Sequence, residues 1–161
     1  MNNYKKLNIR DFQLIIYDFD GVMTDNRVLV FKNGEEAVFV NRSDGLAVKA
    51  IKEMGIRQII VSSEVNPIVA VRAGKLQIAF VQAIDDKKRA VEGYLRQNKI
   101  KREKVIFVGN DINDKSAMEF VGMAVAPSDA HPDIKKLSKV VLSVKGGHGV
   151  VRELLDLLKG R

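Results

Sequence analysis

Short apolar runs alternate with helical patterns along the chain. The run LIIY at positions 14–17 has no polar side, so it is predicted to be a strand in the middle of a parallel sheet. Further core strands are predicted in IRQIIVSS (56–63), QIAFV (77–81), KVIFVGND (104–111), MAVAP (123–127) and VVLSV (140–144). This alternation predicts an α/β fold, a Rossmann-like parallel sheet with helices on both faces.

Capping residues and glycines place the predicted helices between these strands. Asp44 is predicted to cap a helix that ends near Met54 and is stopped by Gly55. Asp85 or Asp86 is predicted to open another helix. The remaining predictions are that this helix ends near Asn98 and that others cover 67–74, 115–121, a short segment from Pro132 and a last segment from about Val150.

One segment departs from the alternation. Positions 27–41, RVLVFKNGEEAVFVN, hold two β-rich runs joined by Asn33-Gly34, which is a strong hairpin signal. A chain of 161 residues, 46% of them hydrophobic, is long enough for one full core and too short for two. We therefore expect a single domain over 1–161, with the hairpin at 27–41 added to the sheet.

The formal net charge of +7 raises the question of a nucleic-acid partner. The densest basic cluster, Lys99, Lys101, Arg102 and Lys104, contains no aromatic residues that could stack on bases. A solvated loop is the better interpretation of this cluster, and we expect no nucleic-acid partner. A positive field would still attract a small anionic substrate.

The composition also limits the compartment and the metal chemistry. The chain has no cysteine, so thiolate ligands, thiol nucleophiles and disulfides are excluded, and a metal ion would be held by oxygen or histidine. No apolar stretch has membrane-spanning length, and the first residues lack the apolar core of a signal peptide. We expect a soluble, cytoplasmic protein without a membrane partner.

Polar residues follow the predicted core strands. Asp18 and Asp20 come after the first strand, where two acids flanking Phe19 would repel each other unless a metal ion compensates. The other polar residues are Ser62 and Ser63 after the second strand, Lys87 at a helix start, and Asn110, Asp111 and Asp114 after KVIFV. Ligands of open α/β sheets bind at the carboxyl ends of the strands, so these loops are expected to meet at one site.

Each of these residues taken alone has a structural interpretation. Ser62 and Ser63 could be a polar strand exit, Lys87 a surface lysine and Asp114 a helix cap. Together they provide carboxylates for Mg²⁺, a hydroxyl donor and a cation at one edge of the sheet. Phosphoryl transfer requires these groups.

Four motifs in this order resemble those of the haloacid dehalogenase superfamily of aspartate-nucleophile phosphatases. They are DFDGV at 18–22, Ser62, DDK ending in Lys87, and GNDIND at 109–114. The segments VNRSDGLAVKAIKEMGI, VGMAVAPSDAHPDIKK and KGGHGVVREL are similar to the small capless branch that dephosphorylates 3-deoxy-2-ketoaldonate phosphates. This branch includes octulosonate 8-phosphate phosphatases, nonulosonate 9-phosphate phosphatases of the sialic acid type, and a domain attached to some acylneuraminate cytidylyltransferases.

The resemblance implies catalytic roles for four residues. Asp18 would be the nucleophile that forms an aspartyl-phosphate, and Asp20 would be the general acid and base. Ser62 and Lys87 would bind the phosphoryl oxygens. The implied substrate is a phosphorylated sugar acid.

The resemblance also implies a Mg²⁺ site. Asp18, the backbone carbonyl of Asp20 and one residue of the fourth motif would hold the ion, with Asp114 as a supporting residue. The family usually has Asp where Asn110 stands, so the ligand is either the Asn110 amide oxygen or the adjacent Asp111. A neutral ligand is expected to lower the affinity for the metal.

Other departures concern the substrate. The resemblance implies substrate contacts for Asp44, Gly45, Ser63 and His148. Ser63 and Glu64 stand where many relatives have Gly-Arg, Ser43 replaces an Arg before Asp-Gly, and His148 replaces the Arg of a GGRG motif. These positions leave the identity of the sugar acid open.

The hairpin is expected to form an interface. Val28, Val30 and Phe39 belong to a ribbon that would be marginal alone and too apolar to remain in water. Capless relatives close their site by tetramerising through this hairpin, so a homotetramer is expected, with residues 146–150 of one subunit approaching the next subunit's site. The alternative is that the ribbon folds back on its own sheet.

Two other functional classes are alternatives to the phosphatase. One is a non-catalytic or weakly active assembly domain, like the domain attached to acylneuraminate cytidylyltransferases. The other is a phosphotransfer receiver domain, which shares the acids and the lysine but fits the fourth motif less well. The carboxylates at 18 and 20 favour the enzyme, because a module without catalysis has no physical need for repelling acids at a strand end.

Overall fold

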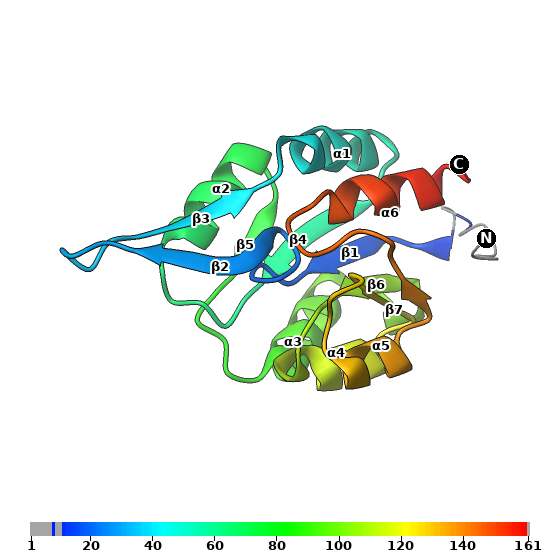
Figure 1. The fold of residues 1–161 in the computed structure, drawn as a ribbon. Coiled ribbons are helices and arrows are strands. Elements are labelled where there is room, and N and C mark those ends of the chain that lie inside the picture. The colour runs from blue at the N-terminus through cyan, green and yellow to red at the C-terminus, as the bar shows by residue number, and fades with distance from the viewer. Residues whose placement is uncertain (1–7, 9–10, 161) are drawn as a thin grey trace.

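The computed structural model describes residues 8 and 11–160, and six strands of this part of the chain form one parallel sheet (Figure 1). The strand order is β5-β4-β1-β6-β7-β8, and all neighbours pair in parallel. The bounds are β1 Leu14–Tyr17, β4 Arg57–Val61, β5 Ala79–Val81, β6 Val105–Val108, β7 Met123–Ala126 and β8 Val140–Val141. The predicted core strands are confirmed, and β1 is central as its apolar run indicated.

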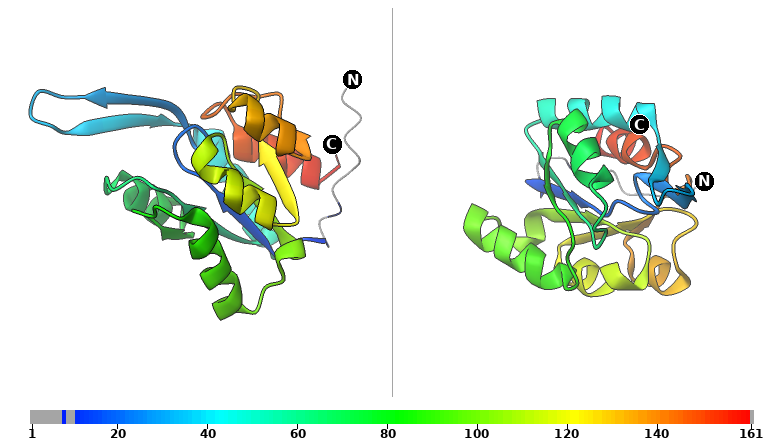
Figure 2. Two further views of the ribbon diagram at one scale, coloured as in Figure 1. Left: turned by 90° about the horizontal axis from the view of Figure 1, so that it is seen from below. Right: turned by 90° about the vertical axis from the view of Figure 1, so that its left-hand side faces the viewer.

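Helices cover both faces of the sheet, as predicted (Figures 1 and 2). One face carries α1 Arg42–Glu53, α2 Ile68–Leu76 and α6 Val150–Leu158, and the other carries α3 Lys87–Asn98, α4 Lys115–Phe120 and α5 Pro132–Leu137. Two 3₁₀ turns, η2 Arg102–Lys104 and η3 Ile112–Asp114, precede β6 and α4. Within the described residues, no helix has both the length and the apolar character needed to cross a bilayer.

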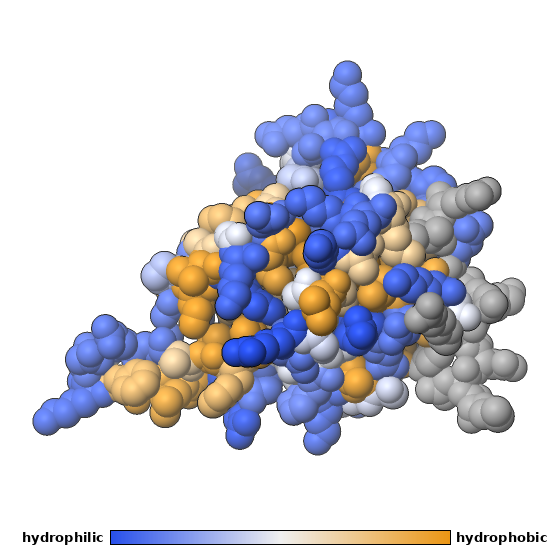
Figure 3. All heavy atoms as spheres, turned by 90° about the horizontal axis from the view of Figure 1, so that it is seen from above, coloured by the Kyte–Doolittle hydropathy of each residue, from blue (hydrophilic) through white to orange (hydrophobic). Residues whose placement is uncertain are grey.

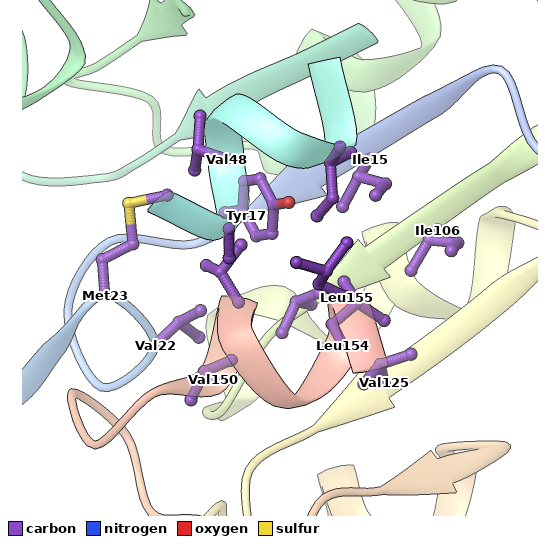
Figure 4. Close-up of a cluster of buried hydrophobic side chains, with 14 of the residues drawn as sticks. Ile15, Tyr17, Val22, Met23, Val48, Ile106, Val125, Val150, Leu154 and Leu155 are labelled. Carbon is purple, nitrogen blue, oxygen red and sulfur yellow. The ribbon is translucent and has the colours of Figure 1, made fainter. Parts of the chain in front are cut away.

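Alternate residues of β1 belong to two buried clusters. Ile15 and Tyr17 pack with side chains of α1 and α6 (Figure 4), and Leu14 and Ile16 pack with those of α3 and α4. The Tyr17 hydroxyl donates to Gln58 Oε1 at 2.9 Å, so its polar atom is satisfied inside the core. Packing on both faces therefore fixes the end of β1, and with it the position of residue 18.

The start of α1 differs from the prediction. Asn41 is the N-cap, because its side-chain oxygen accepts a hydrogen bond from the Ser43 N–H at 2.9 Å. Asp44 lies inside the first turn and is buried. Gly55, with a φ of +82°, follows the end of α1 as predicted. Asp86, not Asp85, caps α3 by accepting the Arg89 N–H at 3.0 Å.

The predicted hairpin forms a separate two-stranded sheet. β2 (Thr24–Val30) and β3 (Glu36–Val40) pair antiparallel, and Asn33 Oδ1 in the connecting loop accepts the Glu35 N–H at 3.1 Å. The ribbon extends away from the main sheet instead of folding back onto it (Figures 1 and 2). Most of its apolar side chains are exposed, with Phe39 71% exposed, while Val38 is half-buried against the core. The exposed ones colour the projecting arm in Figure 3.

Candidate active site

A cleft opens at the carboxyl ends of β1, β4 and β6. Its volume is about 310 Å³. It is lined by Asp18, Asp20, Asn26, Ser62, Ser63, Glu64, Val65, Asn110, Asp111 and Asn113. The residues that follow three predicted strands meet here because parallel strands end at the same edge and β1 lies between β4 and β6.

Asp18 lies at the floor of the cleft. Its N–H donates to the Val108 carbonyl at 2.9 Å, which extends the pairing of β1 and β6 by one residue. Its Oδ1 lies 2.7 Å from the Lys87 ammonium and accepts the Phe19 N–H at 2.7 Å. Burial and then repulsion from Asp114 raise the pKa of Asp18, although Lys87 opposes them. The second oxygen, Oδ2, lies 3.1 Å from the side-chain amide of Asn110.

Lys87 is a buried cation between two carboxylates. It is the first residue of α3 and is 1% exposed, so the interpretation as a surface lysine is wrong. Its Nζ lies 2.6 Å from Asp114 Oδ1 as well as 2.7 Å from Asp18 Oδ1. Burial lowers the pKa of Lys87, but the two carboxylates outweigh burial and raise it. The lysine is therefore charged and reduces the repulsion between the two acids.

Asp114 holds the loop of the fourth motif. Its Oδ2 accepts the N–H groups of Asn110 at 2.9 Å and Asp111 at 3.2 Å, while Oδ1 binds Lys87. The same carboxylate completes a capping box with Asp111 at η3. The structural interpretation of Asp114 as a cap is confirmed, and the same carboxylate also binds Lys87.

Asp18 Oδ2, the Asp20 carbonyl oxygen and the side-chain amide of Asn110 meet at one point of the cleft. In the structure the Asn110 amide oxygen is the atom that lies 3.1 Å from Asp18 Oδ2 and 2.9 Å from the Asp20 carbonyl oxygen. A nitrogen at this position would donate to both, whereas an oxygen leaves three acceptors with no donor between them. Adjacent oxygens on an octahedral Mg²⁺ lie roughly 2.9 Å apart, since each is about 2.1 Å from the ion. Asp18, Asp20 and Asn110 could therefore hold a divalent metal ion.

This oxygen set does not depend on a cluster of acidic side chains. Among the described residues, no group of three His, Cys, Asp or Glu side chains is placed to hold a metal ion. The set instead combines one carboxylate, one main-chain carbonyl and one amide. Asp111 is exposed and its Oδ1 accepts the Ile112 N–H at 2.7 Å, which favours Asn110 over Asp111 as the ligand.

Asp20 lies at the side of the cleft and is partly buried. Burial raises the pKa of this carboxyl, a hydrogen bond from Thr24 lowers it, and the charge of Glu64 raises it. The Thr24 hydroxyl donates to Asp20 Oδ1 at 3.2 Å. A carboxyl whose pKa is raised suits a proton donor. Thr24 is fully buried, and no sequence pattern singles it out beyond its position four residues after Asp20.

The two serines after β4 have different surroundings. Ser62 is buried and its Oγ accepts the Glu64 N–H at 3.1 Å, which leaves the hydroxyl hydrogen available for a phosphoryl oxygen. Ser63 is exposed at the rim, where Asn113 Nδ2 donates to its Oγ at 3.5 Å. Glu64 Oε1 accepts the Val65 N–H at 2.7 Å, which orders its carboxylate at the rim.

Three residues expected to contact substrate do not line the cleft. Asp44 is buried against α6, where it accepts the Arg152 N–H at 3.0 Å, so the expectation of a substrate contact for Asp44 is wrong. Gly45 lies in a groove between α1 and α2. His148 is exposed, with Nδ1 2.7 Å from the Gly146 carbonyl oxygen.

The fold and the site together define a class of protein, the α/β enzymes of phosphoryl transfer, in which a carboxylate, a lysine and a hydroxyl meet at the carboxyl edge of the sheet. A profile of the haloacid dehalogenase-like hydrolases matches residues 46–154, and the chain belongs to this family. It is a phosphoric monoester hydrolase, and the family excludes the receiver domain considered above.

Individual relatives agree with this class. The chain is 36% identical over 155 residues to the 3-deoxy-D-manno-octulosonate 8-phosphate phosphatase KdsC of Salmonella typhi, covering 96% of this chain and 81% of that protein. A protein of Streptomyces avermitilis MA-4680 described as a HAD family hydrolase has a TM-score of 0.94 and 38% identity, covering 97% of this chain and 96% of that one.

A third relative carries ligands. The structure of 3-deoxy-D-manno-octulosonate 8-phosphate phosphatase from Moraxella catarrhalis contains a magnesium ion, a phosphate ion and a KDO molecule. Its TM-score is 0.91 at 26% identity, covering 94% of this chain and 88% of that chain. A divalent metal ion is therefore consistent with the oxygen set beside Asp18.

Proposed function

We propose that the chain hydrolyses the phosphate monoester of a 3-deoxy-2-keto sugar acid, with Mg²⁺ and through an aspartyl-phosphate on Asp18. The observation that carries this proposal is the Asp18 carboxylate. Lys87 binds one of its oxygens, and the other faces Asn110 and the Asp20 carbonyl at the floor of an open cleft. The relatives from Salmonella typhi and Moraxella catarrhalis support octulosonate 8-phosphate as the first candidate substrate.

The proposed reaction has two halves. An Asp18 oxygen attacks phosphorus, the bond from phosphorus to the sugar oxygen breaks, and Asp20 gives that oxygen a proton. Asp20 then takes a proton from water, the water oxygen attacks phosphorus, and the bond to Asp18 breaks to release inorganic phosphate. The Ser62 hydroxyl holds a phosphoryl oxygen. Lys87 does not line the cleft, so its ammonium acts through Asp18, whose charge it compensates, and not by direct contact with the phosphoryl group. The raised pKa of Asp20 supports its role as proton donor.

Asp18, the Asp20 carbonyl and Asn110 are the proposed ligands of Mg²⁺, supported by their mutual distances of 3.1 Å and 2.9 Å. When bound, the ion would neutralise the charge that the Asp18 carboxylate and the phosphoryl group bring together. The neutral amide of Asn110 makes this site less negative than one with a third carboxylate. Lys87 stays beneath the site and compensates Asp18 from the other side.

The sugar end of the substrate needs partners at the rim. Ser63, Glu64 and Asn113 offer hydrogen bonds there, and the departures at Ser63 and Glu64 keep nonulosonate 9-phosphate as the second candidate. The described residues that line the cleft include no Lys, Arg or His. The carboxylate of a sugar acid therefore lacks a cation within one subunit's cleft, which supports a site completed by a second subunit.

A homotetramer assembled through the hairpin is the proposed form of the enzyme. The exposed apolar side chains of the projecting ribbon support it. Residues 146–149 pack on their own chain's segment 21–25 through a hydrogen bond from Gly147 to Val22 at 3.0 Å, so only their outer side could approach a neighbouring subunit.

The experiment that tests the proposal is phosphate release from a panel of sugar phosphates, with and without Mg²⁺. Octulosonate 8-phosphate or a nonulosonate 9-phosphate is expected to be hydrolysed fastest, and removal of Mg²⁺ by a chelator is expected to stop the reaction. A hexose 6-phosphate serves as the unrelated ester. Release from none of these esters would instead support the weakly active assembly domain.

Two variants test the roles of the aspartates. Asp18→Asn is expected to abolish turnover, since an amide cannot form the acyl phosphate. Asp20→Asn is expected to lower the rate for a sugar ester by about 10² to 10⁴, with a smaller loss in the initial burst from an aryl phosphate, whose leaving group needs no proton. Near-normal activity of Asp18→Asn, or equal burst losses on both kinds of ester, would contradict these roles.

A further inference from the structure

We propose that Asp44 is a positioning residue of the phosphatase. It acts through the start of α6 and the glycine loop 146–149 on the segment 21–25, which follows Asp20. The proposal rests on the roles proposed for Asp18 and Asp20, and it is independent of which sugar acid is the substrate.

The first turn of α6 has no capping side chain of its own. The residue before it, Gly149, has a left-handed φ of +98° and makes no side-chain cap bond. Asp44 stands 108 residues earlier, in the first turn of α1, and its Oδ1 accepts the Arg152 N–H at 3.0 Å. The first N–H groups of a helix lack partners within the helix, so this carboxylate supplies the missing cap and faces the positive end of the helix dipole.

Asp44 is buried, with 2% of its surface exposed. The N–H groups of Arg152 and Val151 and the charges of Arg72 and Arg152 oppose the cost of burying its carboxylate. The side chain therefore joins the first turn of α1 to the first turn of α6.

The glycine loop that leads into α6 packs directly on the segment after β1. The Gly147 N–H donates to the Val22 carbonyl at 3.0 Å. A methyl group on Gly146 would overlap the Gly21 carbonyl, and one on Gly147 would overlap the backbone at Thr24 and Asp25. Gly147 also has a φ of +71°, which favours glycine. Two backbones thus touch without side chains between them.

The segment 21–25 in turn holds Asp20. The Thr24 hydroxyl donates to Asp20 Oδ1 at 3.2 Å and accepts the Gly21 N–H at 3.3 Å. Val22 and Val150 belong to one buried cluster, so the segment and the start of α6 share a core (Figure 4). Release of the first turn of α6 would therefore loosen Thr24 and the Asp20 carboxyl, while Ser62 and Lys87 on other elements keep their places. Proton transfer is expected to suffer more than phosphate binding.

The test compares Asp44→Ala with Asp44→Asn and Leu158→Ala. Alanine removes the acceptor, whereas asparagine keeps an oxygen that can accept the Arg152 N–H. Leu158→Ala weakens α6 at its other end, where Leu158 is buried in the same core. Each kcat and KM is measured with the sugar phosphate that the wild type hydrolyses fastest, at a temperature where circular dichroism shows every variant folded.

Asp44→Ala is expected to lower kcat by about tenfold or more with KM changed by less than about threefold. Asp44→Asn and Leu158→Ala are expected to keep kcat within about twofold of the wild type, although Leu158→Ala lowers the melting temperature. An unchanged kcat in Asp44→Ala, or an equal loss of kcat in Leu158→Ala, would overturn the positioning role.

Hydrogen exchange gives a readout that needs no catalysis. Peptides that cover 21–25 and 145–152 are expected to exchange faster in Asp44→Ala, but not in Asp44→Asn or Leu158→Ala. If the wild type hydrolyses none of the esters, the proposed function fails. Unchanged hydrogen exchange at 21–25 in Asp44→Ala would still overturn the proposed coupling between Asp44 and this segment. Should Asp44→Ala not fold, Gly147→Ala displaces the same segment directly; a folded Gly147→Ala with wild-type kcat and exchange would overturn the proposal.

Discussion

At residue 110 the chain carries a neutral amide beside the Asp18 carboxylate. The amide oxygen lies 3.1 Å from Asp18 Oδ2, and the neighbouring Asp111 carboxylate is turned to the N–H of Ile112. Asn110→Asp is expected to tighten Mg²⁺ binding by about tenfold, because it adds a charge to the three oxygens. The measurement is the Mg²⁺ concentration that gives half-maximal activity.

Asp111→Asn is the matched control for this prediction. Asp111 caps η3 from the exposed rim. The half-saturating Mg²⁺ concentration of the Asp111→Asn variant is therefore expected to stay within about twofold of the wild type. A large shift for Asp111→Asn with none for Asn110→Asp would show that Asp111 is the ligand.

Asp44 gives a prediction for stability against pH. Burial raises the pKa of Asp44 from the ordinary value of 3.8 to about 6, while the Arg152 N–H opposes the shift. The folded state therefore binds more protons than the unfolded state between about pH 4 and 6, and the free energy of unfolding falls as the pH rises through this window. A difference of about two pKa units corresponds to at most roughly 3 kcal/mol.

Comparison with Asp44→Asn isolates this contribution. The variant keeps an acceptor for the α6 N–H and does not titrate, so the wild type is expected to lose stability relative to it from pH 4 to 6 and to run parallel to it above pH 7. Urea unfolding across this range measures the difference. Parallel curves at every pH would show that Asp44 has an unshifted pKa.

Residues of the site differ in how far the sequence predicts them. Asp18, Ser62 and Asn110 each follow a core strand, so strand pattern and sheet topology together place them at one edge. Asp44 and Thr24 have no such signal. The partner of Asp44 lies 108 residues away, and the bond of Thr24 to Asp20 depends on the turn between them.

At the scale of elements, one close contact joins the turn before β7 to η2. The Gly122 N–H donates to the Arg102 carbonyl at 2.8 Å, and a methyl group on Gly122 would overlap the backbone of Glu103. Gly122→Ala is expected to lower the free energy of unfolding by about 1–3 kcal/mol. The activity per folded molecule is expected to stay unchanged, because this contact lies at the amino end of β7, opposite the cleft.

Gly93→Ala, in the middle of α3, is the matched control. No heavy atom lies within 4 Å of the position that its Cβ would take. It is expected to stabilise the fold by up to about 1 kcal/mol, because alanine favours a helix over glycine. Urea unfolding of both variants checks the pair, and equal stability of Gly122→Ala and the wild type would contradict the predicted clash.

Most elements are predictable from local pattern, because each buried strand and each helix carries its own apolar period. The start of α1 is the exception. Asn41 and Asp44 are both typical N-cap residues, three positions apart. The choice between them depends on α6, since Asp44 is engaged by the N–H of Arg152, and no local window of sequence contains that contact.

At the scale of the whole molecule, the exposed hairpin predicts that subunits assemble. Val30 is 61% exposed and Phe39 is 71% exposed on a ribbon that has no sheet behind it. Multi-angle light scattering after size exclusion is expected to give the mass of a tetramer for the wild type, and a smaller species for Phe39→Asp in the hairpin. Phe80→Asp, on the edge strand β5, is the control and is expected to remain tetrameric. A monomeric wild type at working concentration would end this proposal.

The sequence indicates an exposed apolar hairpin but not its geometry. The Asn33-Gly34 turn and the β-rich runs predict the pairing of β2 with β3. Whether the ribbon covers its own sheet or extends from it depends on the chain direction at Thr24 and Asn41, where tertiary contacts with residues 147 and 72 fix the two ends. Such contacts have no local signature in the sequence.

The hairpin shares no hydrogen-bonded ladder with the parallel sheet. Between its two ends, Glu36 accepts a hydrogen bond from Asn66 at 3.1 Å and Val38 packs at the edge of the core. The length and the tip of the hairpin can therefore change during evolution without altering the register of β1, β4 or β6. A lineage could extend the ribbon into a lid or exchange it for a docking segment while the acids and the lysine stay in place. The same property makes the loop between β2 and β3 a suitable point for inserting a peptide tag or a foreign domain.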